Sequence, residues 1–271
     1  MTEFVRYNIA MDALVFALYT CAWKTMVAWR PAPQTPAIVG FKDGCEGCDV
    51  STKCALHDSV SPFNRHLVVF TQTADWVERL EKEEGTFFSL VSKQSKALAS
   101  ELKLKVTAAH VPAHGDCQLG MLYPEQLQVV IPSGTDDMIA FIAGLHDDKL
   151  SEGFLGRFKS PAPPSFERLV LVCVHGARDK RCGKAGPHVL EAIQKECSAR
   201  GLDSTLVCGS SHIGGHKYAA TLIAYPGGDW FGQVTPKKVP HLVDFIVSGQ
   251  LEMVQPGGKL NTSFRGRSCD W

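Results

Sequence analysis

Two apolar segments on either side of a helix-length stretch constrain the fold of this chain most strongly. Residues 169–174 form a continuous apolar run and residues 205–208 a shorter one, and such runs are typical of buried strands. The stretch 187–200 between them is predicted as a helix, with Pro187 at its start and Gly201 at its end. Strands that flank one helix pair in parallel with a right-handed crossover, so the sequence predicts a βαβ unit.

The segments that follow extend this unit into a known order of elements. Residues 221–225 and 230–234 flank a Pro-Gly-Gly-Asp turn and are predicted as a β-hairpin. Residues 239–248 are predicted as the last helix. The order strand, helix, strand, hairpin, helix is that of a thioredoxin-like domain, which we expect over 166–271.

The chain before residue 151 is also predicted to alternate strands and helices. The strands are predicted over 66–70, 106–110 and 127–131, and the helices over 76–85, 87–102 and 136–145. Gly156 and three prolines make 151–165 a predicted linker. The fold class is therefore α/β with two α/β domains, and the predicted divisions are a partly loop-like segment 1–62, an α/β domain 63–150, the linker 151–165 and the thioredoxin-like domain 166–271. No internal repeat is obvious in the sequence.

Charge and hydropathy exclude several kinds of partner. The 28 basic residues equal the 28 acidic residues in number, so no basic excess is available to neutralise nucleic-acid phosphates. Residues 10–29 are rich in apolar side chains, but Lys24 interrupts them, and the uninterrupted part is shorter than the about 20 residues that a membrane span needs. We therefore expect no membrane span and a cytoplasmic location, with a mitochondrial location as the alternative.

Cysteine and histidine residues gather in two segments of the predicted thioredoxin-like domain. Cys173 ends the first predicted strand and Cys182 precedes the helix, while His212 and His216 follow the second strand. Parallel strands place their carboxyl ends at one edge of the sheet, so these four side chains should converge. Thiolates and imidazoles bind iron or zinc, and a structural zinc site is one interpretation. Structural zinc sites usually have cysteines two to four residues apart, which favours iron here.

Neighbouring residues fit such a centre. Gly214 and Gly215 lie between the histidines and allow a close approach of the backbone. The loop between the cysteines contains three basic residues that would offset the negative charge of thiolates and sulfides, namely Arg178, Lys180 and Arg181.

These motifs resemble those of the sucrase/ferredoxin-like family. The resemblance rests on Arg178-Asp179-Lys180-Arg181-Cys182-Gly183, on His212-x-Gly-Gly-His216-Lys217 and on Trp230-x-Gly232-x-Val234-Thr235-Pro236. It implies a thioredoxin-like ferredoxin with a [2Fe–2S] cluster bound by Cys173, Cys182, His212 and His216. Histidines at two of the four positions distinguish the chain from ordinary thioredoxin-like ferredoxins, which have cysteines there.

The function implied by this resemblance is one-electron transfer with a protein redox partner, a reductase or an acceptor. A redox enzyme and a cluster-based sensor of oxidative stress are the alternatives. Thioredoxin chemistry is disfavoured because no Cys-x-x-Cys follows the first strand of the domain. Glycoside hydrolysis is disfavoured because we find no pair of carboxylates placed for it.

The remaining cysteines and the C-terminus allow further hypotheses. Cys45, Cys48, Cys54 and His57 are either a zinc clasp or a cysteine-bearing mobile segment. Cys21, Cys197 and Cys208 are predicted in the core, Cys117 in a loop. His175 is interpreted as a ligand, a proton carrier or a partly exposed loop residue. The ending Cys269-Asp270-Trp271 resembles the tripeptide by which clients dock to the cytosolic iron–sulfur targeting complex, and a frayed tail is the alternative.

Overall fold

The computed structural model describes residues 56, 59–98, 101–112, 118–255, 259–260 and 263–267. The strands are β1 (Arg65–Thr71), β2 (Leu104–His110), β3 (Leu119–Tyr123), β4 (Leu127–Val130), β5 (Arg168–Cys173), β6 (Thr205–Ser210), β7 (Leu222–Tyr225), β8 (Asp229–Phe231) and β9 (Phe264–Arg267). The α-helices are α2 (Phe87–Leu98), α3 (Thr135–Leu145), α4 (Glu152–Phe158), α5 (Lys180–Ala199) and α6 (Val239–Ser248). These strands form one sheet in the order β4-β3-β1-β2-β6-β5-β7-β8-β9.

The topology of β1 to α3 is repeated by β5 to α6. In the first half, β1 pairs in parallel with β2 and antiparallel with β3, which pairs antiparallel with β4. In the second half, β5 pairs in parallel with β6 and antiparallel with β7, which pairs antiparallel with β8. Helix α2 connects β1 to β2 as α5 connects β5 to β6. The α/β fold is confirmed, and the thioredoxin-like order predicted for the second half also occurs in the first.

The two halves meet where β2, an edge strand of the first half, lies next to β6, an edge strand of the second half. Strand β2 pairs antiparallel with β6 through Ala109 and Ser210 alone. Beyond this pair the backbone continues as a loop, and the N–H of Ser211 donates to the carbonyl of Ala108 at 2.8 Å. The loop that follows β6 therefore lies against β2 of the first half.

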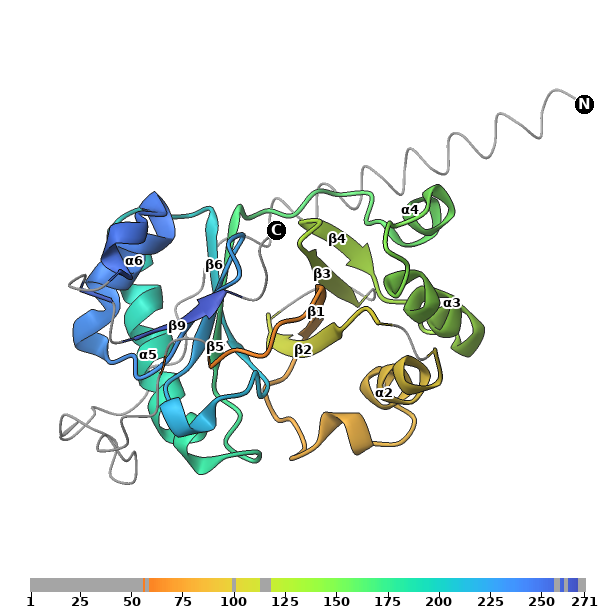
Figure 1. Cartoon of the computed structure of the whole chain (residues 1–271), viewed down its shortest axis with the longest axis horizontal. Helices are drawn as coiled ribbons and strands as arrows, with labels where there is room; N and C mark the ends of the chain where they lie inside the picture. Colours follow the sequence, from red (N-terminus) through yellow and green to blue (C-terminus); the bar gives the residue numbers. More distant parts are fainter. Residues whose placement is uncertain are drawn as a thin grey trace, which may run out of the picture. The chain divides into compact units, whose positions relative to one another are not determined.

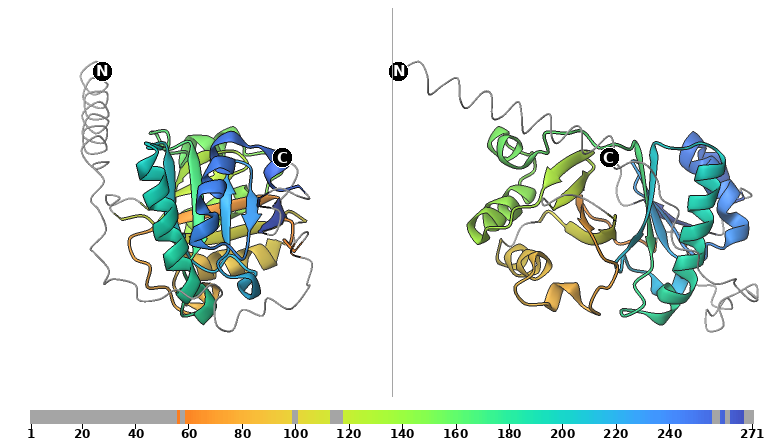
Figure 2. Two further views of the ribbon diagram at one scale, coloured as in Figure 1. Left: turned by 90° about the vertical axis from the view of Figure 1, so that its left-hand side faces the viewer. Right: turned by 180° about the vertical axis from the view of Figure 1, so that it is seen from behind.

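Hydrophobic side chains divide between two clusters according to the faces of the strands. Leu67 and Val69 of β1 pack with α2, α3 and α4, while Val68 and Phe70 pack with residues of the second half. This alternation is the period of two expected of a strand buried on both faces. Helices α2 to α4 and helices α5 and α6 accordingly flank the strands from opposite sides in Figure 1, and Figure 2 shows the same arrangement from behind.

Several predicted elements differ in extent from the observed ones. The helix predicted over 76–85 is wrong, since only Leu80–Lys82 form a short 3-10 helix there. The carbonyls of Trp76 and Val77 instead accept hydrogen bonds from His175, so they are unavailable to a helix. The predicted linker 151–165 contains α4, whose N-cap Ser151 accepts from the N–H of Phe154. The division into domains at this linker stays a prediction.

Helix α5 begins earlier than predicted, and Pro187 lies inside it. Asp179 is its N-cap, and its side chain accepts from the N–H of Arg181 at 2.9 Å. Cys182 is therefore in the first turn of the helix, whereas the prediction placed it before the helix.

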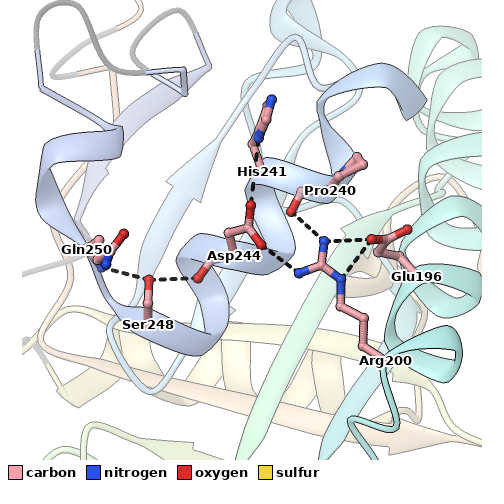
Figure 3. A network of polar contacts seen from close by, with 7 residues as sticks. All are labelled: Glu196, Arg200, Pro240, His241, Asp244, Ser248 and Gln250. Carbon is pink, nitrogen blue, oxygen red and sulfur yellow. Dashed lines mark hydrogen bonds and ion pairs between the residues drawn. The ribbon is translucent and has the colours of Figure 1, made fainter.

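A polar network connects the C-terminal end of α5 to α6 (Figure 3). The Arg200 guanidinium donates to Glu196, to Asp244 and to the carbonyl of Pro240.

A buried histidine of β1 links the two halves of the chain. His66 of β1 makes hydrogen bonds of 2.5 Å to the hydroxyl of Tyr225 and 2.8 Å to the hydroxyl of Thr107. Burial lowers the pKa of His66, so the imidazole is neutral.

We expect Tyr225→Phe to leave Nδ1 of His66 without its partner and to reduce the free energy of unfolding by about 1–3 kcal/mol. Urea unfolding measures this, and an unchanged midpoint would contradict it.

Candidate metal centre

Three of the four predicted ligands lie together at the carboxyl ends of β5 and β6. Cys173 is the last residue of β5, Cys182 lies in the first turn of α5, and His212 follows β6. The two Sγ atoms and a ring nitrogen of His212 lie within 4.8 Å of one another. Both cysteines are fully buried. Residues distant in the sequence thus form one compact donor group, as the βαβ geometry predicts.

His216 lies beside this group, at its exposed side. Its ring centroid is 5.3 Å from that of His212, with the two rings inclined at 34°. Its Nε2 is 3.9 Å from a carboxylate oxygen of Asp179, and 47% of the side chain is exposed. The two histidines therefore form an adjacent pair, of which His212 faces inward and His216 faces solvent.

Glycines allow the close packing that brings Cys182 to Cys173. A Cβ added at Gly186 of α5 would lie 2.1 Å from the carbonyl oxygen of Cys173. A Cβ added at Gly183 would lie 2.5 Å from the Cα of Gly176. Any side chain at either position would push α5 away from the end of β5, so these glycines set the spacing between the two thiols.

The surroundings of the two thiols shift their pKa values in opposite directions. The pKa of Cys173 is lowered, first by the hydrogen bond with Cys182 and then by His212 and the backbone N–H groups of His175 and Ile213, against the effect of burial. The same hydrogen bond, together with burial, raises the pKa of Cys182. A metal that binds both sulfurs would displace the protons of the thiols.

The donor atoms are of the types that bind a soft metal or an iron–sulfur cluster. Buried thiolates and neutral imidazoles are the ligands that such centres use. The Nδ1 atom of His212 is buried and has no hydrogen-bond partner among the described residues. A buried, unpaired ring nitrogen is costly in a folded protein, and a metal bound at this atom would satisfy it.

His175 has a structural role that differs from all three predicted ones. It is 4% exposed, so the interpretation as a partly exposed loop residue is wrong. Its Nε2 donates to the carbonyl of Val77 at 3.0 Å, and its Nδ1 accepts from the N–H of His212 at 3.1 Å. Both ring nitrogens are occupied by backbone groups, so His175 supports the loop that contains His212.

The basic residues of the cysteine loop are partly paired with acids. Arg181 forms a two-bond pair with Asp179, at 3.0 and 2.9 Å, which lowers the pKa of Asp179 to about 2. Arg178 lies 4.0 Å from Glu78. Lys105 contacts the backbone of Ile213, and the Arg265 guanidinium lies against Gly215, so both cations lie beside the histidine loop although neither was predicted. A lysine in β2, one position before the strand predicted over 106–110, is the one signal that could have indicated Lys105.

The other predicted sites divide into confirmed and undescribed ones. Cys197 and Cys208 are buried free thiols, so their assignment to the core is confirmed. The remaining cysteines, His57 and Trp271 lie outside the described residues; those cysteines are Cys21, Cys45, Cys48, Cys54, Cys117 and Cys269. Within the described part of the chain, none of the helices is both long and apolar enough to cross a membrane.

The solved structures that this chain matches are only distantly similar to it. The thioredoxin-like [2Fe–2S] ferredoxin from Aquifex aeolicus is 18% identical to this chain, with a TM-score of 0.31. The match covers 38% of this chain and 100% of the ferredoxin. At this TM-score the likeness supports no conclusion, so the fold assignment rests on the strand order and pairing described above.

Comparison with known sequences identifies the family. Altered inheritance of mitochondria protein 32 of Debaryomyces hansenii is 29% identical over 218 residues, 70% of this chain and 80% of the relative. Actin patches distal protein 1 of Saccharomyces cerevisiae is 30% identical over 131 residues, 42% of each chain. The family model described as sucrase/ferredoxin-like matches residues 56–266, which include all four candidate ligands. This chain therefore belongs to the sucrase/ferredoxin-like family.

Proposed function

We propose that the chain binds a [2Fe–2S] cluster through Cys173, Cys182, His212 and His216 and transfers single electrons. The observation that supports this best is the gathering of two thiols and two imidazoles from distant parts of the sequence. The two thiols and a ring nitrogen of His212 lie within 4.8 Å of one another, and the ring of His216 lies next to that of His212 at the exposed side. A [2Fe–2S] cluster has two irons with two protein ligands each, and in Rieske centres one iron has two cysteines and the other two histidines.

The residues of the chain serve this function in different ways. The cysteines at the end of β5 and the start of α5 would hold the cluster together with the histidine pair. A bound cluster supplies the capacity to accept and release one electron. The half-exposed ring of His216 places the histidine side near the surface, where a reductase or an acceptor protein would exchange the electron.

The test is the composition of the chain purified without air. We expect two irons and two sulfides per chain, an absorption spectrum in the visible range, and an electron paramagnetic resonance signal after reduction. Zinc without sulfide would contradict the proposal and favour the structural metal site. Turnover of a small substrate by the loaded protein alone, without a redox partner, would favour an enzyme over a carrier.

A further inference from the structure

The loop after β6 that contains His212, here called the ligand loop, is connected to the first half of the chain at three successive residues. These are Ser211, His212 and Ile213. Ser211 exchanges two hydrogen bonds with Ala108 of β2: its N–H donates to the carbonyl at 2.8 Å, and its hydroxyl accepts from the N–H at 3.0 Å. His212 is held through His175, whose other ring nitrogen donates to Val77. The segment that carries the ligand histidine is therefore connected to the first half directly at Ser211 and, through His175, at His212.

Lys105 makes the third of these contacts. Its Nζ donates to the carbonyl oxygen of Ile213 at 2.9 Å. The N–H of the same Ile213 faces the sulfur of Cys173 and helps to lower the pKa of that thiol. Through Ile213, the ammonium group of β2 is thus connected to the buried cysteine and to the backbone between the two histidines.

The ammonium group of Lys105 is partly enclosed by aromatic rings. It lies 5.3 Å from the ring centroid of Trp230 and 5.9 Å from that of Phe63. Burial lowers the pKa of Lys105 to about 8. A charged group in such a place costs free energy of folding, which ring contacts and one hydrogen bond only partly offset. An apolar side chain would fill the same space at a lower cost in free energy of folding. The lysine at this position is therefore best explained by a function of its charge.

We propose that Lys105 is a positioning residue of the metal centre and, when protonated, a positive charge beside it. This inference rests on the proposed cluster. The hydrogen bond to Ile213 keeps the loop of His212 in place, as groups behind metal ligands do in many metalloproteins. Reduction adds a negative charge to a cluster, and a cation that the rings shield from water stabilises that charge more than a surface cation does. Lys105 therefore makes the centre easier to reduce and slower to lose its iron.

The variant Lys105→Met tests both effects, because methionine fills much of the same space without charge or hydrogen bond. We expect the equilibrium constant for reduction to fall about tenfold, which corresponds to a midpoint potential about 59 mV more negative for a one-electron couple. We also expect iron release to a chelator to become about tenfold faster, in the range found for residues behind metal ligands. Lys105→Arg keeps the charge and should preserve most of the potential.

The matched control is Lys103→Met, which removes the same charge from an exposed residue just before β2. It should leave the potential and the chelator release unchanged. If Lys105→Met behaves like Lys103→Met while the wild type holds its cluster, the role of Lys105 is wrong and the proposed function stands. If the wild type holds no iron and sulfide, both proposals fail. Urea midpoints show whether each variant is folded, and Lys105→Gln replaces the methionine variant if that one is not.

Discussion

Cys173→Ser and Cys182→Ser are each expected to be colourless after anaerobic purification, with iron and sulfide close to zero per chain. Serine has the shape of cysteine but is a poor ligand for iron, because its hydroxyl stays protonated near neutral pH and its oxygen is harder than sulfur. Each cysteine is fully buried, and the two sulfurs share one small donor group. The described residues of this compact group contain no third thiol that could replace a lost one.

The control for these variants lies on the same helix as Cys182. Cys197 is a buried free thiol of α5, and Cys197→Ser should keep the iron and sulfide of the wild type. Iron, sulfide and the unfolding midpoint are measured for all three variants. Equal retention of iron in Cys173→Ser, Cys182→Ser and Cys197→Ser would rule out this ligand set, whereas loss in all three would indicate a folding defect.

The second large effect is a dependence of the reduction potential on pH. A ligand histidine binds iron through one ring nitrogen and can carry a proton on the other. Reduction makes the cluster more negative and raises the proton affinity of that nitrogen. Because His216 is half-exposed, protons can reach it from solvent. The potential should therefore fall as the pH rises, by about 59 mV per pH unit for one proton per electron.

Substitution of the histidines separates this coupling from a purely electrostatic effect. His216→Cys or His212→Cys should lower the potential, because a thiolate replaces a neutral imidazole, and should flatten the slope. His241→Gln, on α6 beside Asp244, removes a histidine that is not a candidate ligand and should change neither property. Protein-film voltammetry between pH 6 and 10 measures the slope. A potential that stays flat in the wild type would show that the histidines tune the cluster without coupling protons to electrons.

The core of the second half could be predicted from the sequence because its signals are local. The apolar runs of β5 and β6 and the spacing of four ligand-type residues were enough to predict where the side chains meet. The start of α5 was predicted too late, since Gly183, Gly186 and Pro187 are poor helix formers. The close packing of Gly186 against the end of β5 and of Gly183 against Gly176 overrides that propensity. Strand β9, with the sequence Phe-Arg-Gly-Arg, has no apolar alternation and is held by pairing with β8.

The support of the ligand loop could not be predicted, because it depends on contacts between residues far apart in the chain. Nothing local indicates that His175 bonds to the carbonyl of Val77 or that Lys105 reaches Ile213. The repeat of the topology was equally hidden, since β3 is short and the two halves share strand order and pairing without an obvious shared sequence pattern. Sequence signals indicated which residues are chemically suited to the site, and the tertiary structure shows how they are held.

The joining of two similar halves in one polypeptide has a consequence at low protein concentration. If each half were a separate molecule, the contacts from β2 to the loop after β6 would form only in a complex, and dilution would remove them. In a single chain the effective concentration of one half near the other is set by the connecting segment and does not fall on dilution. We therefore expect the retention of metal per chain to be independent of protein concentration.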